Sequence, residues 1–313
     1  MTERIESGME AEASGPVPGW GWTETSLATM VLIWGVNFPI VKSALASFQP
    51  LAFNAIRFAL ASVLVLLVLL ARGEAGLPAR RDLPRIVTLG LLGNVAYQMC
   101  FIIGLSRTPA GHAAVVLALT PVCIALLSTL TGAERPGPRT WGGALLSVIG
   151  IGLVTGAGLR VSGREALVGN AILLGACITW ALYTVGARPI VARYGSLQAT
   201  AWTLWVGTVG LLAVGAPALR RQAYAELPAA AWAGLLFSAA FAIALAYLIW
   251  YRGVERIGNT RTAIFSNLTP VVAMAAAALL LGERPGPAAL LGAAMTLTGV
   301  MIVRSDPGAA APA

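Results

Sequence analysis

Charge is scarce in this sequence. Asp, Glu, Lys and Arg make up 11% of its 313 residues, against about 25% in an average soluble domain. The mean hydropathy is correspondingly high, at +0.79. So few charged residues could not cover the surface of a soluble fold of this size. The composition therefore indicates an integral membrane protein, with the lipid bilayer as a partner.

The residues from which catalytic and metal sites are usually built are also few. His112 is the only histidine, and the three cysteines form no CxxC pair. The sequence contains no Walker motif, which excludes ATP as a driving force. We therefore predict no metal, no other cofactor and no enzyme activity.

The positive charges do not form a nucleic-acid-binding surface. Lys42 is the only lysine, and the arginines occur singly or in pairs between apolar segments, so no nucleic-acid partner is expected. The acidic first residues lack the basic region of a signal peptide. We expect residues 1–24 to be a disordered cytoplasmic tail and residues 304–313 to be a second cytoplasmic tail.

Long apolar segments are abundant. A membrane-spanning helix needs about 20 apolar residues. Ten segments qualify: 25–43, 50–71, 85–105, 109–131, 139–157, 167–187, 196–216, 229–251, 259–281 and 286–303. With a cytoplasmic N-terminus, 13 Lys and Arg residues flank the spans on the inside and 7 on the outside. This bias favours a multi-pass protein of the plasma membrane with both termini in the cytoplasm. We expect it to be a monomer or a dimer.

A sequence repeat divides these spans into two halves. Residues 119–138 match residues 268–287 at ten of twenty positions, without a gap and at an offset of 149. We therefore expect five-helix repeats at 25–157 and 167–303, joined by a linker at 158–166. Because five is odd, the second repeat must enter the membrane from the opposite side. The predicted fold is an all-α polytopic membrane protein with ten transmembrane helices in two inverted five-helix repeats, which is typical of secondary transporters.

The pentapeptide ERPGP ends both copies of the repeat, at Glu134–Pro138 and Glu283–Pro287. Its Pro and Gly residues are typical of a tight turn between two helices, and its charges suit the water interface better than a substrate site. In the fifth span, Gly152 and Gly156 have the spacing of helix-packing glycines.

These motifs resemble those of a known family. IWGVNFPIVK (33–42), IRF (56–58), the two LTP triplets and the AERPGP and GERPGP turns are similar to EamA-type members of the drug/metabolite transporter superfamily. The resemblance covers about residues 25–303. It implies ten helices, cytoplasmic termini, a central cavity between the repeats, and export of metabolites, amino acids or drugs by alternating access.

The first span places Trp34, Asn37 and Phe38 on one helical face, beside Pro39. Polar and aromatic groups at this depth are costly against lipid, so the face should point into the bundle. Pro39 removes a backbone hydrogen bond and leaves a carbonyl free. This face is predicted to line the substrate cavity with Pro39 as a hinge, although Trp34 and Asn37 could instead only hold helices together.

Other spans carry comparable groups, for which cavity lining and helix packing both remain open. They are Asn94, Tyr97 and Gln98 in the third span, Trp180 and Tyr183 in the sixth, Tyr247 in the eighth and Asn267 in the ninth. The LTP triplets add Thr120–Pro121 and Thr269–Pro270. Proline kinks a helix, and matched kinks in two repeats indicate a midplane substrate site or paired packing kinks.

Two ionisable residues remain. Arg57 lies about 10 Å into the second span, counted from Pro50 at 1.5 Å per residue. We expect it to bond loop carbonyls at the outer mouth, or alternatively to attract an anionic group of the substrate. His112 starts the fourth span, where it could pack against neighbours or sense protons.

No Asp or Glu falls in the middle of any span, which disfavours exchange of a cation against a buried carboxylate. The predicted function is a secondary exporter of a small neutral or zwitterionic metabolite, such as an amino acid, and its substrate is the expected small-molecule partner. Efflux of many drugs or cationic compounds is the alternative. An intramembrane enzyme is disfavoured because catalytic groups are not clustered.

Overall fold

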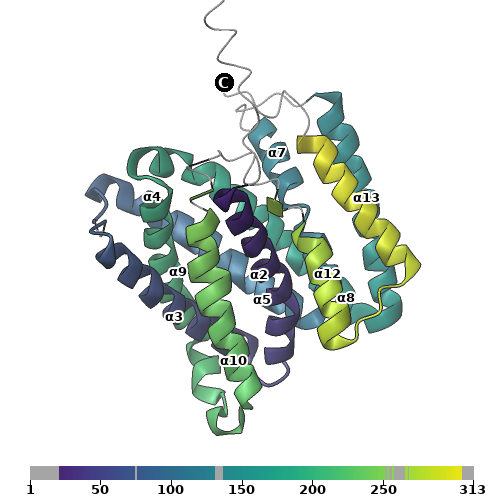
Figure 1. Ribbon diagram of the computed structural model, residues 1–313, viewed down its shortest axis with the longest axis horizontal. Helices are drawn as coiled ribbons and strands as arrows, with labels where there is room; N and C mark the ends of the chain where they lie inside the picture. The colour runs from purple at the N-terminus through teal and green to yellow at the C-terminus, as the bar shows by residue number, and fades with distance from the viewer. Residues whose placement is uncertain are drawn as a thin grey trace, which may run out of the picture.

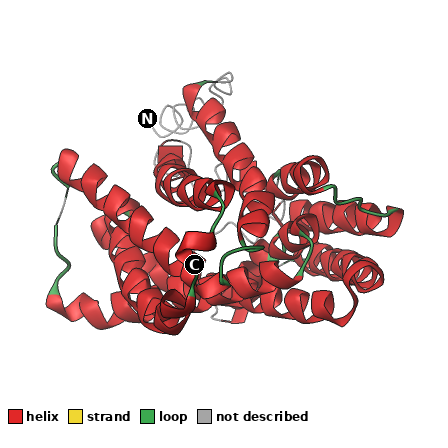
Figure 2. Cartoon of the chain, turned by 90° about the horizontal axis from the view of Figure 1, so that it is seen from below, coloured by secondary structure: helices red, strands yellow, loops and turns green. Residues whose placement is uncertain are grey.

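A computed structural model describes residues 21–74, 76–130, 137–250, 252–253, 256, 265–266 and 268–304. Within these residues the chain forms helices and loops and no strand (Figure 1, Figure 2). The elements are α2 (Trp22–Ala44), α3 (Pro50–Ala71), η2 (Arg80–Asp82), α4 (Leu83–Gly90), η3 (Leu91–Ala96), α5 (Tyr97–Arg107), α6 (Ala110–Leu117), α7 (Thr120–Leu130), α8 (Pro138–Tyr194), α9 (Ser196–Arg221), η4 (Tyr224–Glu226), α10 (Ala229–Phe237), η5 (Ser238–Leu245), α12 (Thr269–Leu281) and α13 (Pro287–Arg304).

These elements match the predicted spans. Six described segments are long and apolar enough to cross a membrane, and four shorter apolar helices accompany them. The third span is one continuous segment from η2 to α5, and the fourth is the pair α6 and α7. The ninth is described at residues 265–266 and from 268 onward, where α12 begins at Thr269. Residues 257–264 and 267 lie outside the described part of the chain. The protein is an all-α, multi-pass membrane protein.

The segment expected to link the repeats is helical. α8 runs through residues 158–166, and only Gly163 departs from helical geometry, with φ 62° and ψ −149°. A side chain is strained at this positive φ, so glycine allows the sharp change of direction there. The fifth and sixth spans therefore follow each other as two helices joined at Gly163.

The last helix of each repeat packs against the other through symmetric glycine contacts. A Cβ on Gly150 of α8 would collide with the carbonyl oxygen of Gly292 in α13, and a Cβ on Gly299 with the carbonyl of Gly143. Gly143 and Gly292 are 149 residues apart, as are Gly150 and Gly299. Because residue numbers rise along one helix as they fall along the other, the two helices are antiparallel.

Hydrogen bonds mark the symmetry axis between these helices. The Ser147 hydroxyl donates to the Gly143 carbonyl at 2.9 Å, and the Thr296 hydroxyl donates to the Gly292 carbonyl at 2.8 Å. Ser147 also reaches the carbonyl of Thr296, its own repeat counterpart, at 3.2 Å. Figure 1 shows α13, in yellow, lying along α8 at one side of the molecule. The antiparallel crossing of equivalent helices is the geometry of an inverted repeat.

The packing role predicted for Gly152 and Gly156 is wrong. No described atom lies within 4 Å of a Cβ built on either residue, and both line a cavity. The glycine that packs in this stretch is Gly150. Spacing alone could not distinguish these residues, because the sequence does not show which face of α8 meets α13.

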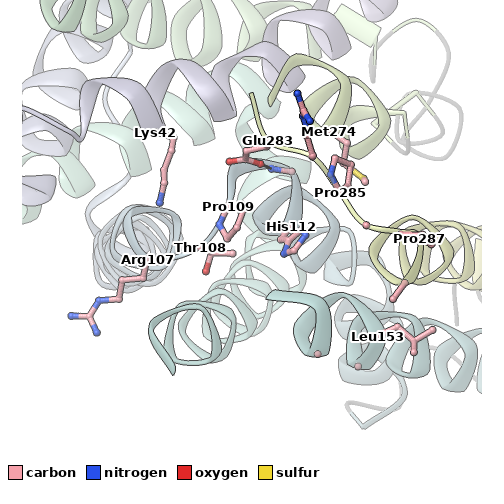
Figure 3. A pocket seen from close by; sticks show the side chains of 16 residues that line it. Lys42, Arg107, Thr108, Pro109, His112, Leu153, Met274, Glu283, Pro285 and Pro287 are labelled. Atoms are coloured by element: carbon pink, nitrogen blue, oxygen red, sulfur yellow. Dashed lines mark hydrogen bonds between the residues drawn. The ribbon is translucent and has the colours of Figure 1, made fainter. Parts of the chain in front are cut away.

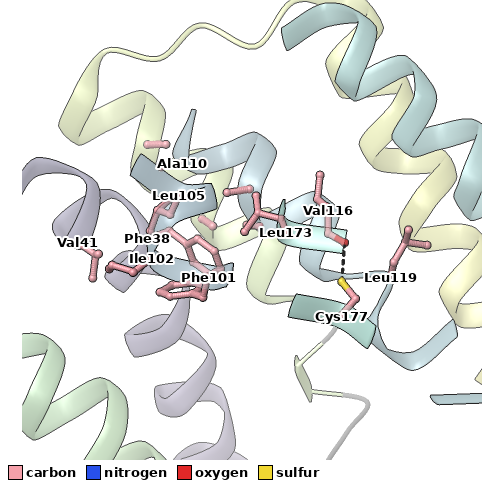
Figure 4. Packing of buried hydrophobic residues seen from close by; sticks show 14 of the residues in the cluster. Phe38, Val41, Phe101, Ile102, Leu105, Ala110, Val116, Leu119, Leu173 and Cys177 are labelled. Carbon is pink, nitrogen blue, oxygen red and sulfur yellow. Dashed lines mark hydrogen bonds between the residues drawn. The ribbon is translucent and has the colours of Figure 1, made fainter. Parts of the chain in front are cut away.

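The largest buried apolar cluster joins helices of both repeats. Figure 4 shows Phe38 of α2 against Phe101 of α5, with Leu173 and Cys177 of α8 close to Val116 of α6. The Cys177 thiol donates to the Val116 carbonyl at 3.5 Å. All three cysteines are free thiols, and Cys177 is buried as a small hydrophobic residue.

An ionic cluster joins η2, the short turn before α4, to the end of α8. Asp82 accepts from Tyr194 at 2.6 Å and from Arg193 at 2.6 Å. The Tyr194 hydrogen bond and then the Arg193 guanidinium lower the pKa of the Asp82 carboxyl. The ionised form therefore stabilises the fold above the ordinary Asp pKa of about 3.9, and this contribution is lost as the pH falls through the lowered value.

We expect Asp82→Asn to lower the melting temperature of the detergent-solubilised protein at neutral pH. The difference from the unsubstituted protein should shrink below about pH 4, because the unfolded chain then takes up a proton that folded Asp82 binds only at lower pH. Melting curves recorded from pH 3 to pH 8 measure this. A difference that does not depend on pH would contradict the assignment.

Candidate functional site

Two π-helical segments occupy matching positions in the two repeats. η3 interrupts the third span between α4 and α5, and η5 interrupts the eighth span after α10. Moved along the chain by 149 residues, η3 coincides with residues 240–245, inside η5. π segments inside α-helices often occur at functional sites, because they widen the helix and disturb its regular hydrogen bonds.

An aromatic residue from the other repeat covers each π segment. The Trp34 indole of α2 donates to the Ala242 carbonyl in η5 at 2.9 Å. The Tyr183 ring of α8 packs directly over Gly93 in η3, where a Cβ would collide with it. Trp34 and Tyr183 are 149 residues apart, and so are Gly93 and Ala242. The first and sixth spans thus meet the eighth and third spans through residues at equivalent positions, by a hydrogen bond in one case and by ring packing in the other.

Four of the predicted aromatic residues form a continuous chain through Phe101: Phe38, Tyr97, Trp180 and Tyr183. Trp34 lies outside this chain and packs against Trp250, with ring centroids 5.7 Å apart. Tyr97 stacks on Phe101 with ring centroids 6.2 Å apart, and Trp180 lies 4.8 Å from Tyr97 and 5.2 Å from Tyr183. Phe38 meets Phe101 edge-on at 5.8 Å. Residues predicted on the first, third and sixth spans therefore come together, along an interface shared by the two repeats.

Arg57 lies beside this aromatic chain and not at a loop, which corrects the expected bond to loop carbonyls. Its side chain is 2% exposed. The guanidinium donates to Asn54 Oδ1 and Gln98 Oε1, both at 2.6 Å, and to Ser238 Oγ at 3.1 Å. Phe53, Phe58 and Phe101 surround it, each with its ring centroid 5.5–5.7 Å from the guanidinium carbon. The guanidinium therefore joins the second, third and eighth spans inside the bundle.

Other predicted site residues also lie in the interior, with different partners. Tyr247 is half-buried in the eighth span and within electrostatic range of Arg57. Asn94 is buried, and its amide donates to the Thr203 carbonyl of α9 at 2.9 Å, as expected for a packing residue. Asn37 Oδ1 and Thr269 Oγ1 are buried and have no hydrogen-bond partner among the described residues.

The predicted prolines lie at a break between two helices, inside a helix and at a helix start. α6 ends at Leu117, and α7 begins at Thr120, next to Pro121. Because Pro121 has no N–H, it cannot bond the Leu117 carbonyl, and the Thr120 hydroxyl donates to that carbonyl at 2.7 Å instead. Pro39 is buried within α2. Pro270 is buried in the first turn of α12, whereas Asn267 lies outside the described residues.

A cavity lies where α2, α5 and α12 end. It has a volume of about 620 Å³ and is lined by Lys42, Arg107, His112, Glu283 and Arg284, among others (Figure 3). His112 is buried, and its Nδ1 has no partner among the described residues. Lys42 donates to the carbonyls of Leu105 and Ser106, both at 2.8 Å. We call this space the Glu283 cavity.

The second copy of ERPGP, at Glu283–Pro287, forms a turn and also supplies a cap to another helix. α12 ends at Leu281, the next residue Gly282 has φ 67°, and α13 begins at Pro287, so the segment does form the predicted turn. The Glu283 carboxylate also accepts from the backbone N–H groups of Ala110 at 2.7 Å and Gly111 at 3.1 Å. It therefore caps α6 of the other repeat. In the first copy, at Glu134–Pro138, the residues Glu134–Pro136 lie outside the described part of the chain.

We expect Glu283→Gln to destabilise the fold, because a neutral amide replaces the charge at the positive end of α6. Loss of a helix cap costs about 0.5–2 kcal/mol. The measurement is the melting temperature in detergent, with Glu226→Gln in the exposed η4 segment as the matched control. Equal melting temperatures for both variants would show that the carboxylate is dispensable.

No group of three or more His, Cys, Asp or Glu side chains that could hold a metal ion occurs in the described part of the chain. Two antiparallel repeats with paired π segments and a polar–aromatic interior are instead the features of a membrane transporter.

Comparisons with known proteins agree with this class. The sequence profile of the EamA-like transporter family matches twice, at residues 21–156 and 167–305. The chain belongs to the EamA-like transporter family. The family and the relatives named below are transporters rather than enzymes.

Relatives match over most of their length. A protein of Streptantibioticus cattleyicolor named "Probable terminal-alkyne amino-acid exporter" is 30% identical over 89% of this chain and 92% of its own. The uncharacterized transporter YyaM of Bacillus subtilis is 29% identical over 77% of this chain and 80% of its own. A solved crystal structure, 17% identical, superposes with a TM-score of 0.64 over 90% of this chain and 96% of its own, which supports the fold alone.

Proposed function

We propose that the protein exports a small neutral or zwitterionic metabolite, such as an amino acid, across the plasma membrane without ATP. The observation that carries this proposal is the interior site itself. Aromatic rings, amide side chains and a single cation meet where the repeats contact each other, and no described carboxylate joins them. Such groups suit a solute with apolar and hydrogen-bonding parts.

The absence of acidic groups at this site argues against the multidrug or cationic alternative. The described acidic residues lie in loops or near helix ends: Glu24, Glu74, Asp82, Glu165, Glu226 and Glu283. A permanent cation would meet the positive charge of Arg57 with no described carboxylate to compensate it. The name of the Streptantibioticus relative also supports an amino acid as cargo.

We further propose that transport proceeds by alternating access, with both termini in the cytoplasm. Inverted repeats can exchange conformations by symmetry, so that the site opens first to one side and then to the other. The third, eighth and fourth spans depart from regular α-helical geometry at η3, at η5 and between α6 and α7, respectively. The distribution of Lys and Arg supports the orientation.

The test is transport by purified protein in proteoliposomes. The vesicles are loaded or incubated with radiolabelled neutral amino acids, and protein-free vesicles serve as the control. We expect saturable movement of at least one amino acid and no movement of a quaternary ammonium dye. Movement of the dye alone would favour the multidrug alternative, and movement of no solute would refute the proposal.

A further inference from the structure

The charge of Arg57 is not neutralised by the described part of the protein. Its three hydrogen-bond acceptors, Asn54, Gln98 and Ser238, are neutral side chains. Moving a cation out of water costs several kcal/mol even after relaxation, unless an opposite charge compensates it. Ionisable side chains in membrane spans therefore mark functional sites by default.

Two hydrogen-bond donors beside this charge are unused. Arg57 Nε and Asn54 Nδ2 are both buried, and neither has an acceptor among the described residues. The Asn54 oxygen already accepts from Arg57, which leaves its NH2 group available. A buried donor without a partner costs about 1–3 kcal/mol. Because a hydrogen bond joins Arg57 to Asn54, the two unused donors belong to one pair of side chains, and an anion with two acceptor oxygens would supply the acceptors that they lack.

We propose that Arg57 and Asn54 bind the carboxylate of the transported solute. This inference rests on the proposed function and specifies its substrate class: a small zwitterionic carboxylic acid with an apolar remainder. Guanidinium and carboxylate form paired, charge-assisted hydrogen bonds. The three phenylalanine rings around the guanidinium keep the local dielectric constant low, which strengthens the pairing.

The remainder of the solute meets the aromatic chain. Phe101 contacts both the guanidinium and the Tyr97 ring, so a carboxylate on Arg57 places its substituent next to Tyr97 and Trp180. The second repeat has no matching cation, because Val206 stands 149 residues after Arg57. The solute is therefore bound in one orientation, with its acid group on the side of the first repeat.

Two of the acceptors of Arg57 lie at the ends of the π segments. Gln98 lies two residues after η3, and Ser238 is the first residue of η5. A carboxylate that displaces either acceptor from Arg57 changes a contact at the end of a π segment. Binding thus acts on the third and eighth spans, one from each repeat.

The experiment compares acids with their amides. Proteoliposomes receive each labelled amino acid that the unsubstituted protein moves, and separately the carboxamide of the same amino acid. We expect the acid to be moved at least about tenfold faster, since a charge-assisted bond contributes about 1.5–3 kcal/mol and 1.4 kcal/mol is tenfold. Arg57→Gln should reduce transport of the acid by about 100-fold and change transport of the amide much less.

Controls separate the possible outcomes. Arg72→Gln removes a surface arginine paired with Glu74 and should leave both rates unchanged. Should Arg57→Gln fail to fold, the comparison of acid with amide in the unsubstituted protein still decides. Equal transport of acids and amides, or full acid transport by folded Arg57→Gln, would overturn the inference alone. Movement of no solute would overturn the proposed function, and this inference with it.

Discussion

Replacing Gly150 with leucine should prevent the two repeats from packing at α8 and α13. Even a Cβ at this position would overlap the Gly292 carbonyl and the Thr296 side chain. Overpacking in a well-packed core costs about 1–3 kcal/mol for small insertions, and a backbone neighbour cannot rotate away as a side chain can. We expect most of the protein to be lost from the monodisperse peak in size-exclusion chromatography.

Gly142→Leu is the matched control for this variant. Gly142 lies on the same helix and is exposed, and a Cβ there meets no described atom within 4 Å. The control should give a normal chromatographic peak, because its side chain points into lipid or detergent. A normal peak for Gly150→Leu as well would contradict the antiparallel glycine contact.

Replacing Tyr97 with alanine should reduce transport by at least about tenfold while the protein still folds. Tyr97 is half-buried and connects Phe101 to Trp180, so its loss removes the centre of the aromatic chain. An aromatic pair contributes about 0.5–1.5 kcal/mol beyond area burial, and two pairs are broken. The measurements are the initial rate in proteoliposomes and the amount of folded protein.

Two further variants define what Tyr97 does. Tyr97→Phe keeps both ring contacts and should retain most of the transport. Tyr224→Ala removes an exposed ring in η4, stacked on Trp232, and should leave the rate unchanged. If Tyr97→Ala lost folded protein in proportion to transport, Tyr97 would be a packing residue and the site would lie elsewhere.

The fold could be predicted from sequence because hydrophobic length and internal repetition are properties of the sequence itself. Twenty apolar residues span a bilayer whatever their neighbours, and the 149-residue offset is visible in LTP and ERPGP alone. The same offset pairs Gly143 with Gly292, which meet at the symmetric crossing of α8 and α13. The opposed direction of the repeats followed from the odd number of spans.

The site could be predicted only in part, because contacts between distant residues leave no local pattern. Tyr97, Trp180 and Tyr183 were selected as polar aromatics deep in apolar spans, and they do come together. Asn54 lies three residues before Arg57 on the same helix, so helical spacing could identify it. Gln98 and Ser238 come from two other spans, and sequence spacing could not identify them. The position of Gln98 just after η3 and of Ser238 at the start of η5 likewise left no pattern in the sequence.

Two further features depended on three-dimensional geometry. A π segment is a local change of hydrogen bonding with no known composition, so η3 and η5 could not be predicted from their apolar residues. The capping role of Glu283 needed the knowledge that α12 of one repeat ends beside α6 of the other. The glutamate at the same place in both copies of ERPGP was the available signal, but the sequence indicated only a turn there.

The most direct test of the central claim, two repeats inserted in opposite directions, is the sidedness of the two ERPGP turns. Single cysteines are introduced by Arg135→Cys and Arg284→Cys in a chain whose three native cysteines are replaced, and intact cells are treated with a membrane-impermeant maleimide. We predict that the cysteine at position 284, where the arginine is exposed, reacts in intact cells, and that the one at 135 reacts only after permeabilisation. Labelling of both from the same side would contradict the inverted repeat and the transport mechanism built on it.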